Sequence, residues 1–267
     1  MSNIKLIALD IDGTIMDGRF IISDRVKKAV KCAVDAGIYV VLATGRMYSA
    51  TVPIADELGI KTPLITYQGG MVKEFFNSSE VLLHYTISPD LSQKIIKELR
   101  NYNAQINVYL DDELFVENES DILVEYSQKR HIIYHKIKSF DKVSELNPTK
   151  ILCIGENSAC TTEIKDYLKG KYSDNLYITK STPLFCEIVN NKASKGKAIL
   201  FLAEKWGIKT SQIMAIGDQD NDSEMLKVAG LSVAMGNADS GLKEIAKYVT
   251  DTVDNNGAAL AIEKFAL

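Results

Sequence analysis

The sequence predicts an α/β protein, a doubly wound parallel sheet interrupted by an inserted α+β domain. Short apolar runs without polar alternation alternate with helical patterns near both ends of the chain, which is typical of parallel strands covered on both faces. Of the 16 glycines, 14 lie in 1–82 and 190–267, while the 107 residues of 83–189 hold 8 of 12 tyrosines and all three histidines. This change of composition predicts that 83–189 is inserted into a domain formed by the two outer segments.

The first outer segment alternates strands with helices. Lys5–Leu9 is expected to be a buried strand, and the following helix begins after Ser23, a good N-cap, and ends at Gly37. A second strand, a helix and a third strand then follow at Ile38–Ala43, Tyr48–Leu58 and Pro63–Tyr67.

The second outer segment continues in the same way. Its expected strands are Ile213–Ile216 and Leu231–Ala234, and its expected helices are Lys197–Trp206, Ser223–Ala229, Gly241–Tyr248 and Ala258–Phe265. Buried strands separated by helices complete the expected parallel sheet.

The middle of the chain has hairpins as well as helices. Hairpins are expected at 72–85 and, around the Asp111-Asp112-Glu113 turn, at 106–116. Helices are expected at Pro89–Asn101, Asp121–Lys129 and Cys160–Leu168, and strands at Lys150–Ile154, Leu176–Ile178 and Cys186–Val189. Together they predict an α+β insert with a largely antiparallel sheet.

Composition and charge narrow the class of protein. With 46% hydrophobic and 25% charged residues, the 267-residue chain has the make-up of a folded globular protein. Its 31 basic and 35 acidic residues give a net charge of −4, without the basic tract that nucleic acid or an anionic membrane would attract. We expect no nucleic-acid and no membrane partner, and a small-molecule ligand instead.

Apolar runs bear on location. Ile38–Ala43, among the longest, has six residues, far short of the ~20 of a membrane span. The apolar start Leu6–Leu9 ends at Asp10, too early for a secretory leader, and the four cysteines form no C-x-x-C pair. These features predict a cytoplasmic protein with reduced thiols.

Acidic side chains follow two of the expected strands. Asp10 and Asp12 come directly after the first strand, and the segment 217–222, which contains Asp218 and Asp222, follows the strand at Ile213–Ile216. Each cluster alone is also compatible with turn and N-cap chemistry. Because ligands bind at the carboxyl ends of parallel strands, the two clusters are expected to meet, and their repulsion calls for a cation. Oxygen ligands without a His/Cys set favour Mg²⁺ over zinc.

Groups that could bind an anion follow the second expected strand and lie near the start of a later helix. Thr44-Gly45-Arg46 offers a hydroxyl and backbone N–H groups after the second strand, and Lys195-Gly196 offers an ammonium near a helix start. Each feature alone carries little weight. Next to paired carboxylates and a metal, they form a coherent phosphoryl-transfer site.

At these residues the chain resembles the haloacid dehalogenase superfamily, and within it the Cof-type sugar-phosphate phosphatases with a large α+β cap. Four ordered segments carry the resemblance, which extends over nearly the whole chain: Asp10-Ile11-Asp12-Gly13-Thr14, Thr44-Gly45-Arg46, Lys195-Gly196, and Gly217-Asp218 through Asn221-Asp222. The resemblance implies a Rossmann-like core, a cap that selects substrate, and a small phosphorylated metabolite as substrate.

The resemblance also implies a role for each residue. Asp10 would be the nucleophile that forms an aspartyl-phosphate, and Asp12 the general acid and base. Asp10, the Asp12 backbone carbonyl and Asp218 would hold Mg²⁺, with Asp222 steadying a coordinated water. The remaining set would bind the phosphoryl oxygens: Thr44, Gly45, Lys195 and Asn221. Arg46 is either a substrate contact or the ion-pair partner of a neighbouring acid.

Two other functions use the same residues. One is phosphoryl transfer to another acceptor, as in a mutase, and the other is a non-catalytic binder of phosphorylated metabolites. Intact Asp10 and Asp12 favour catalysis. The chain departs from its relatives at Gln68 and Lys192, which are expected to affect the floor and rim of the substrate pocket.

Overall fold

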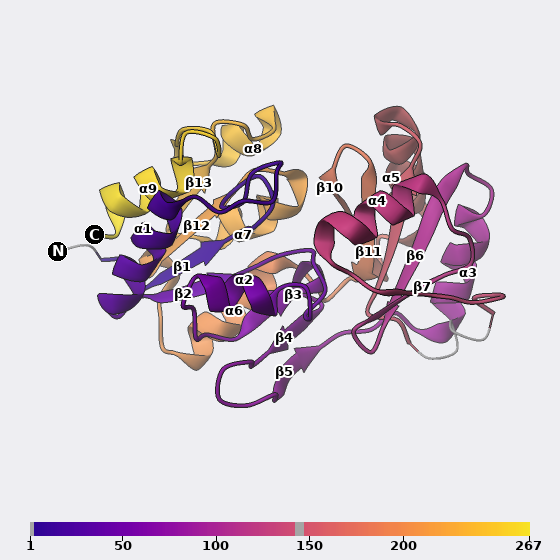
Figure 1. Ribbon diagram of the computed structural model, residues 1–267, viewed down its shortest axis with the longest axis horizontal. Helices are drawn as coiled ribbons and strands as arrows, with labels where there is room; N and C mark the ends of the chain where they lie inside the picture. The colour runs from indigo at the N-terminus through magenta and orange to yellow at the C-terminus, as the bar shows by residue number, and fades with distance from the viewer. Residues whose placement is uncertain (1–2, 142–146) are drawn as a thin grey trace.

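The computed structural model describes residues 3–141 and 147–267. Figure 1 shows two bodies side by side, one built on a parallel sheet and containing both chain ends, the other formed by the middle of the chain. No described helix is long and apolar enough to cross a membrane.

A parallel sheet of five strands forms the centre of the first body. Its strand order is β14-β13-β12-β1-β2, and every pairing is parallel. The four longer strands are almost entirely buried because both faces are covered. The strands are β1 (Leu6–Leu9), β2 (Tyr39–Leu42), β12 (Ile213–Gly217), β13 (Leu231–Ala234) and β14 (Tyr248–Val249).

The chain winds outward from β1 in both directions, as the sequence predicts. One direction is β1 to β2, and the other is β12 to β13 to β14, so right-handed crossovers put the connecting helices on opposite faces. The helices of this body are α1 (Asp24–Asp35), α2 (Val52–Glu57), α6 (Lys195–Lys205), α7 (Ser223–Val228), α8 (Ser240–Ile245) and α9 (Gly257–Phe265).

Two helices of this body differ from the expected ranges by more than two residues at one end. Helix α2 begins only at Val52, because the residues before it form turns whose N–H groups are bound by the Asp112 carboxylate. Helix α8 ends at Ile245, where Ala246 adopts an extended conformation, and Tyr248 belongs to the unexpected strand β14.

A small three-stranded sheet extends the first body. The expected third strand, β3 (Leu64–Thr66), joins the parallel sheet through a single bridge between Ala43 and Ile65. Its main partner is antiparallel β4 (Met71–Lys73), which pairs in turn with β5 (Val81–His84). The hairpin expected at 72–85 is therefore confirmed, but it packs on the first body.

The second body is an α+β unit with a six-stranded sheet. The strand order is β10-β11-β9-β6-β7-β8, antiparallel except for β7 and β8. The short strand β8 was not expected from the sequence. The elements are α3 (Pro89–Leu99), β6 (Ala104–Leu110), β7 (Glu113–Val116), α4 (Asp121–Arg130), β8 (Tyr134–Lys136), β9 (Lys150–Gly155), α5 (Ser158–Tyr172), β10 (Leu176–Thr182) and β11 (Phe185–Asn190).

Separate hydrophobic cores support a division into two domains. One core lies around β1 and β12, and another between α3, α5 and the second sheet. Strands β5 and β11 run through the expected boundaries at 82/83 and 189/190. We propose that the chain divides into a core domain, formed by 1–82 and 190–267, and a cap domain, 83–189, with both crossings near these strand ends.

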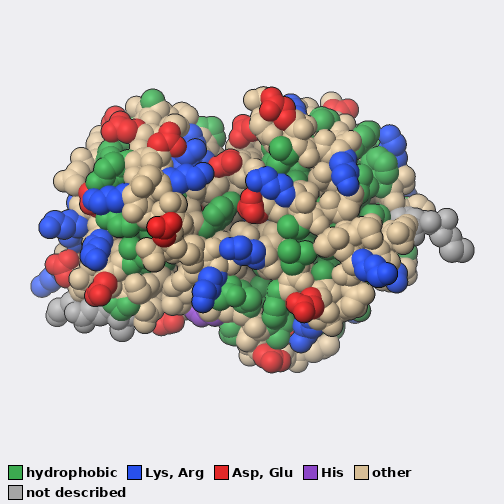
Figure 2. Space-filling model, turned by 180° about the vertical axis from the view of Figure 1, so that it is seen from behind, with side chains coloured by type: hydrophobic (Ala, Val, Ile, Leu, Met, Phe, Trp, Pro, Cys, Tyr) green, Lys and Arg blue, Asp and Glu red, His purple; other side chains and the backbone are tan. Residues whose placement is uncertain are grey.

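The cap touches the core domain through a buried hydrophobic cluster that both share around Tyr67, and through polar contacts at the seam visible in Figure 2. Asp112, at the tip of the β6–β7 hairpin, accepts hydrogen bonds from the N–H groups of Tyr48 and Ser49 (2.8 and 2.9 Å) and from the Tyr67 hydroxyl (2.5 Å). Thr179 of the cap donates to Asp220 of the core at 3.1 Å. These contacts hold the cap closed.

Replacing Asp112 should loosen this seam. Asp112→Asn removes the charge that three donors share but keeps a side chain that tolerates the positive φ of 62° at this position. We expect a loss of about 1–2 kcal/mol in unfolding free energy, measured by urea denaturation. Asp111→Asn is the matched control, since Asp111 is exposed and has a similar φ of 51°. Equal losses in both variants would contradict the role given to Asp112.

Candidate active site

Three neighbouring strands deliver the predicted site residues to one edge of the sheet. Strand β1 lies between β12 and β2 in parallel, so all three end at the same edge. Asp10 follows β1, Asp218 follows β12 and Thr44 follows β2. The convergence expected from the sequence is therefore present.

A group of three buried carboxylates lies at this edge. One oxygen each from Asp10, Asp218 and Asp222 lies within 4.8 Å of the others. The exposed fractions of these residues are 6%, 3% and 0%. Negative charges that lie this close together and are shielded from water repel one another strongly.

One buried ammonium partly neutralises the group. Lys195, in the first turn of α6, donates from Nζ to Oδ1 of Asp10 at 2.5 Å and to Oδ1 of Asp222 at 2.6 Å. Burial would lower the pKa of Lys195, but the two carboxylates outweigh it and raise that pKa. Lys195 is therefore a protonated part of the site, and its binding of a phosphoryl oxygen stays a prediction.

A single positive charge leaves the three carboxylates with an excess of negative charge. Burial, with the charge of Asp222 next in importance, raises the pKa of Asp10 well above its ordinary value. The same causes raise the pKa of Asp218 to about 7. Without a metal ion, these carboxyl groups therefore favour binding protons at the place where a cation would also be favoured.

The position directly after the paired aspartates, Gly13, has room only for a glycine. Its φ is +83°, and a Cβ there would lie 2.3 Å from Oδ2 of Asp218. Next to it, the Thr14 hydroxyl donates to Oδ1 of Asp218 at 3.0 Å. The first loop therefore fixes the position of the carboxylate that follows β12.

These residues fit a hard divalent cation. The converging donors are oxygens only, and Asp218 makes no ion pair within the described part of the chain. Carboxylate oxygens without nitrogen or sulfur ligands suit Mg²⁺. A divalent cation would offset the negative charge that Lys195 leaves.

Arg46 forms an ion pair with Asp12, one of the two roles left open by the sequence. Its Nε and Nη2 contact Oδ2 and Oδ1 of Asp12 at 2.8 and 2.6 Å. Burial would raise the pKa of Asp12, but the hydrogen bonds and charge of Arg46 outweigh it and lower that pKa. The side chain of Asp12 is 33% exposed and lines the cavity.

Donors suited to phosphoryl oxygens lie beside Asp10. The N–H of Gly45 has no hydrogen-bond partner within the described residues, while the Thr44 hydroxyl accepts from the N–H of Arg46 at 3.1 Å. Asn221 is 4% exposed and donates to Oε1 of Gln68 at 3.1 Å. All of the sequence-predicted site residues are thus gathered in one place.

Gln68 supports the floor of the site. A Cβ on Gly45 would lie 2.3 Å from Nε2 of Gln68, so this buried amide packs directly against the backbone of Gly45. Lys192, also expected to affect the pocket, does not line the cavity. It is exposed and borders a separate recess with Gly69 and Tyr85.

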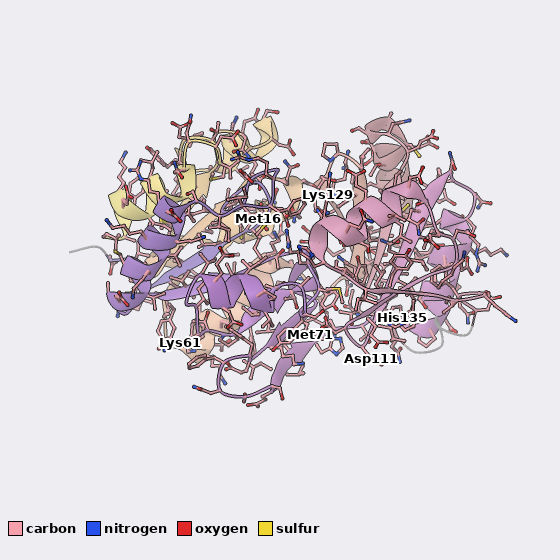
Figure 3. All side chains as sticks on the ribbon, in the orientation of Figure 1. Met16, Lys61, Met71, Asp111, Lys129 and His135 are labelled. Carbon is pink, nitrogen blue, oxygen red and sulfur yellow. The ribbon has the colours of Figure 1, made fainter. Side chains whose placement is uncertain are left out.

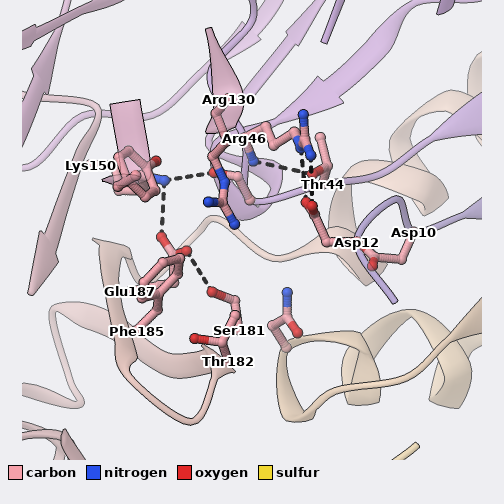
Figure 4. Close-up of a pocket in the computed structure, with 13 residues that line it drawn as sticks. Asp10, Asp12, Thr44, Arg46, Arg130, Lys150, Ser181, Thr182, Phe185 and Glu187 are labelled. Carbon is pink, nitrogen blue, oxygen red and sulfur yellow. Dashed lines mark hydrogen bonds and ion pairs between the residues drawn. The ribbon is translucent and has the colours of Figure 1, made fainter. Parts of the chain in front are cut away.

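The cap closes over the site and leaves a cavity of ≈ 40 Å³ (Figure 4). Lys150 of β9 donates to the carbonyl oxygen of Gly45 at 2.6 Å and pairs with Glu187 of β11 at 3.0 Å. The Ser181 hydroxyl donates to Glu187 at 2.7 Å. The cap residues that line the cavity are Tyr126, Arg130, Lys150, Ser181, Thr182, Phe185 and Glu187.

Sequence reasoning did not single out these cap residues. Glu187 stands in an otherwise apolar strand and is 3% exposed, and Lys150 opens another such strand at 1%. A charged residue inside a buried run was the available signal, because such residues are buried only when paired. Arg130 had no such signal, since a cation in the last turn of a helix is common.

Comparisons with known proteins agree with this geometry. The family model of haloacid dehalogenase-like hydrolases matches residues 7–262. A putative phosphatase of Streptococcus pyogenes is 32% identical over 99% of both chains. A Bacillus subtilis 5-amino-6-(5-phospho-D-ribitylamino)uracil phosphatase is 31% identical over 97% of both chains.

A solved structure shares the whole architecture. A haloacid dehalogenase-like hydrolase from Bacteroides thetaiotaomicron superposes with a TM-score of 0.84 at 29% identity, covering 98% of this chain and 99% of its own. The α/β fold with its additional sheet is confirmed by this likeness.

The raised pKa values predict an unusual pH dependence. Asp10 and Asp218 bind protons more tightly when folded than when unfolded, so their contribution to stability is lost as pH rises, and the raised pKa of Asp218 places its loss below about pH 7. In chelator, the melting temperature should fall as pH rises from about 4 to about 7, and Mg²⁺ should raise it most at the upper end.

Asp218→Asn isolates this effect from other titrating groups. The variant should show a shallower fall of melting temperature with pH than the wild type, because one raised carboxyl is gone. Calorimetry of both proteins in chelator tests this. Identical slopes would show that Asp218 is not the proton-binding group.

Proposed function

The chain belongs to the haloacid dehalogenase-like hydrolases, in their Cof-type subfamily, and we propose that it hydrolyses small phosphomonoesters with Mg²⁺ through an aspartyl-phosphate. Membership in this family makes the chain an enzyme, a phosphatase, which removes the non-catalytic binder considered above.

The position of Asp10 carries the proposal. Lys195 holds Oδ1 of Asp10 in one orientation, and no hydrogen bond within the described chain reaches Oδ2. Oδ2 is therefore the oxygen free to attack phosphorus. Attack would form a covalent Asp10–phosphate bond and release the alcohol, which divides hydrolysis into two easier steps.

Groups around Asp10 suit the charge of a phosphoryl group. The free N–H of Gly45, the Asn221 amide and the Thr44 hydroxyl would bind its oxygens, and the Lys195 ammonium would add a positive charge. Because these groups are held in place before substrate arrives, they can stabilise charge in the transition state without reorganising.

Asp12 is proposed to move the proton. Its side chain is 33% exposed and lines the cavity under the cap, where the leaving oxygen of the substrate would lie. As an acid, it would protonate that oxygen, and as a carboxylate it would then take a proton from the water that attacks the intermediate. Arg46 favours the carboxylate form, so the first step requires that their contact loosen.

The metal would be held by the groups that fit it. We propose that Asp10, the backbone carbonyl of Asp12 and Asp218 are its ligands, and that Asp222 orients a bound water. Mg²⁺ at this place would neutralise charge on the phosphoryl oxygens.

The closed cap bears on the substrate. A cavity of ≈ 40 Å³ has room for about one water molecule, so the cap must swing away before a metabolite can enter. The B. subtilis relative is named for a ribityl phosphate ester, which supports a sugar phosphate or similar small metabolite here. The cytoplasmic location expected from the sequence stays part of this proposal.

Separate variants of the two aspartates test the mechanism. With 4-nitrophenyl phosphate, whose leaving group needs little protonation, Asp12→Asn should release about one equivalent of 4-nitrophenol in a burst and then stall. Asp10→Asn should give no burst, because the attacking oxygen is lost. Rapid mixing in the presence of Mg²⁺ measures both.

Alkyl phosphates provide the matched control. Their basic leaving oxygen needs the proton from Asp12, so Asp12→Asn should lose roughly 10²–10⁴-fold in alkyl phosphate turnover. Equal bursts in the two variants, or undiminished alkyl turnover by Asp12→Asn, would contradict the assigned roles.

A further inference from the structure

One cationic side chain of the cap faces the cavity without an acidic partner. Three basic residues line the cavity: Arg46, Lys150 and Arg130. Arg46 is paired with Asp12, and Lys150 with Glu187. No carboxylate within residues 3–141 and 147–267 lies within ion-pair distance of Arg130, and no dashed line reaches its guanidinium in Figure 4.

Aromatic rings hold the guanidinium of Arg130 in place. Its Cζ lies 4.7 Å from the ring centre of Tyr126 and 5.3 Å from those of Phe185 and Phe20. Tyr126 is itself fixed by a 2.6 Å hydrogen bond between its hydroxyl and that of Tyr109. A ring face stabilises a cation that lies over it, but it does not accept the five N–H groups that lie in the plane of the guanidinium. These donors stay available to a ligand.

The cap wall of the cavity therefore carries one uncompensated positive charge. Lys150 and Glu187 cancel each other, and Ser181 and Thr182 contribute hydroxyl groups. A half-buried guanidinium without a counter-ion loses hydration, and an anion from the ligand would restore the balance. The wall suits a hydroxylated molecule with one negative charge.

The place of Arg130 separates this charge from the phosphoryl group. Its guanidinium lies 5.3 Å from the ring centre of Phe20, and that of Arg46, the ion-pair partner of Asp12, lies 5.7 Å from the same ring, so Arg130 lies on the side of Asp12. Under the proposed mechanism that is the side of the leaving group. The groups proposed for the phosphoryl oxygens, among them Lys195 and Asn221, belong to the core domain instead.

We propose that Arg130 binds a carboxylate on the leaving group of the substrate, so that the preferred substrates are phosphorylated hydroxy acids. A planar guanidinium matches a carboxylate with two parallel hydrogen bonds. A carboxylate brings one negative charge to a wall with one uncompensated positive charge, whereas a second phosphate would bring nearly two. The proposal rests on the phosphatase function above and adds the class of substrate.

Matched substrate pairs test it. 6-Phosphogluconate and sorbitol 6-phosphate differ only in a carboxylate replacing a hydroxymethyl group, and 3-phosphoglycerate and glycerol 3-phosphate form a shorter pair of the same kind. We expect wild type to prefer the acid in at least one pair. Arg130→Gln should reduce kcat/KM for that acid about tenfold or more, and for its alcohol about twofold or less.

Lys129→Gln is the control on the same helix. Lys129 pairs with Glu125, is 51% exposed in its side chain, and lies on α4 outside the cavity lining (Figure 3). It should leave both substrates of a pair unchanged. Arg130→Lys should retain part of the preference, because charge remains while the fork is lost.

Several results would overturn the assignment. Equal losses of kcat/KM for acid and alcohol in Arg130→Gln would mean that Arg130 contacts the transferred phosphoryl group or has a structural role. A lowered melting temperature of the variant would indicate the structural role. A wild type that prefers the alcohol in both pairs would also refute it. So would a preference for 5-amino-6-(5-phospho-D-ribitylamino)uracil that Arg130→Gln leaves intact. Failure to hydrolyse even 4-nitrophenyl phosphate would instead contradict the proposed function itself.

Discussion

Three buried carboxylates repel one another at the edge of the parallel sheet, and the arrangement of the site follows from that repulsion. Asp10, Asp218 and Asp222 bring oxygens within 4.8 Å of one another, almost without solvent. Like charges at such distances in a low-dielectric site are costly unless cations or protons offset them. Lys195 provides one positive charge, and a divalent metal would provide the remainder.

Parallel sheet topology is what makes this arrangement possible. Adjacent strands that end at the same edge bring residues 204 positions apart, Thr14 and Asp218, into hydrogen-bond contact. Gly13 leaves the space that the Asp218 carboxylate occupies. The fold thus imposes the crowding, and the crowding creates affinity for a cation.

Local sequence patterns could place the core-domain residues of the site, because these residues directly follow strands. Buried strands end where their apolar runs end, so Asp10, Thr44 and Asp218 could be placed at one edge before any contact was known. Helix α2 shows the limit of such patterns. Its late start depends on Asp112, about 60 residues away in another domain, which no local window contains.

The cap residues of the site could not be predicted from local sequence patterns, because residues distant in the sequence form their environment. Arg130 looks like any cation at a helix end until Tyr126, Phe185 and Phe20 are seen around it. Phe20 comes from the core domain, so this environment exists only when the two domains meet. Chemistry is thus proposed to belong to the core, and choice of substrate to the seam.

The most direct test is phosphate release by protein freed of metal and then titrated with Mg²⁺. We expect no measurable turnover of 4-nitrophenyl phosphate in chelator, and recovery as one Mg²⁺ binds per chain. Asp218→Asn should require a much higher Mg²⁺ concentration or fail to recover. Full activity in thoroughly metal-free protein, or an unchanged Mg²⁺ requirement in Asp218→Asn, would contradict the claim that the buried carboxylates act through a divalent cation.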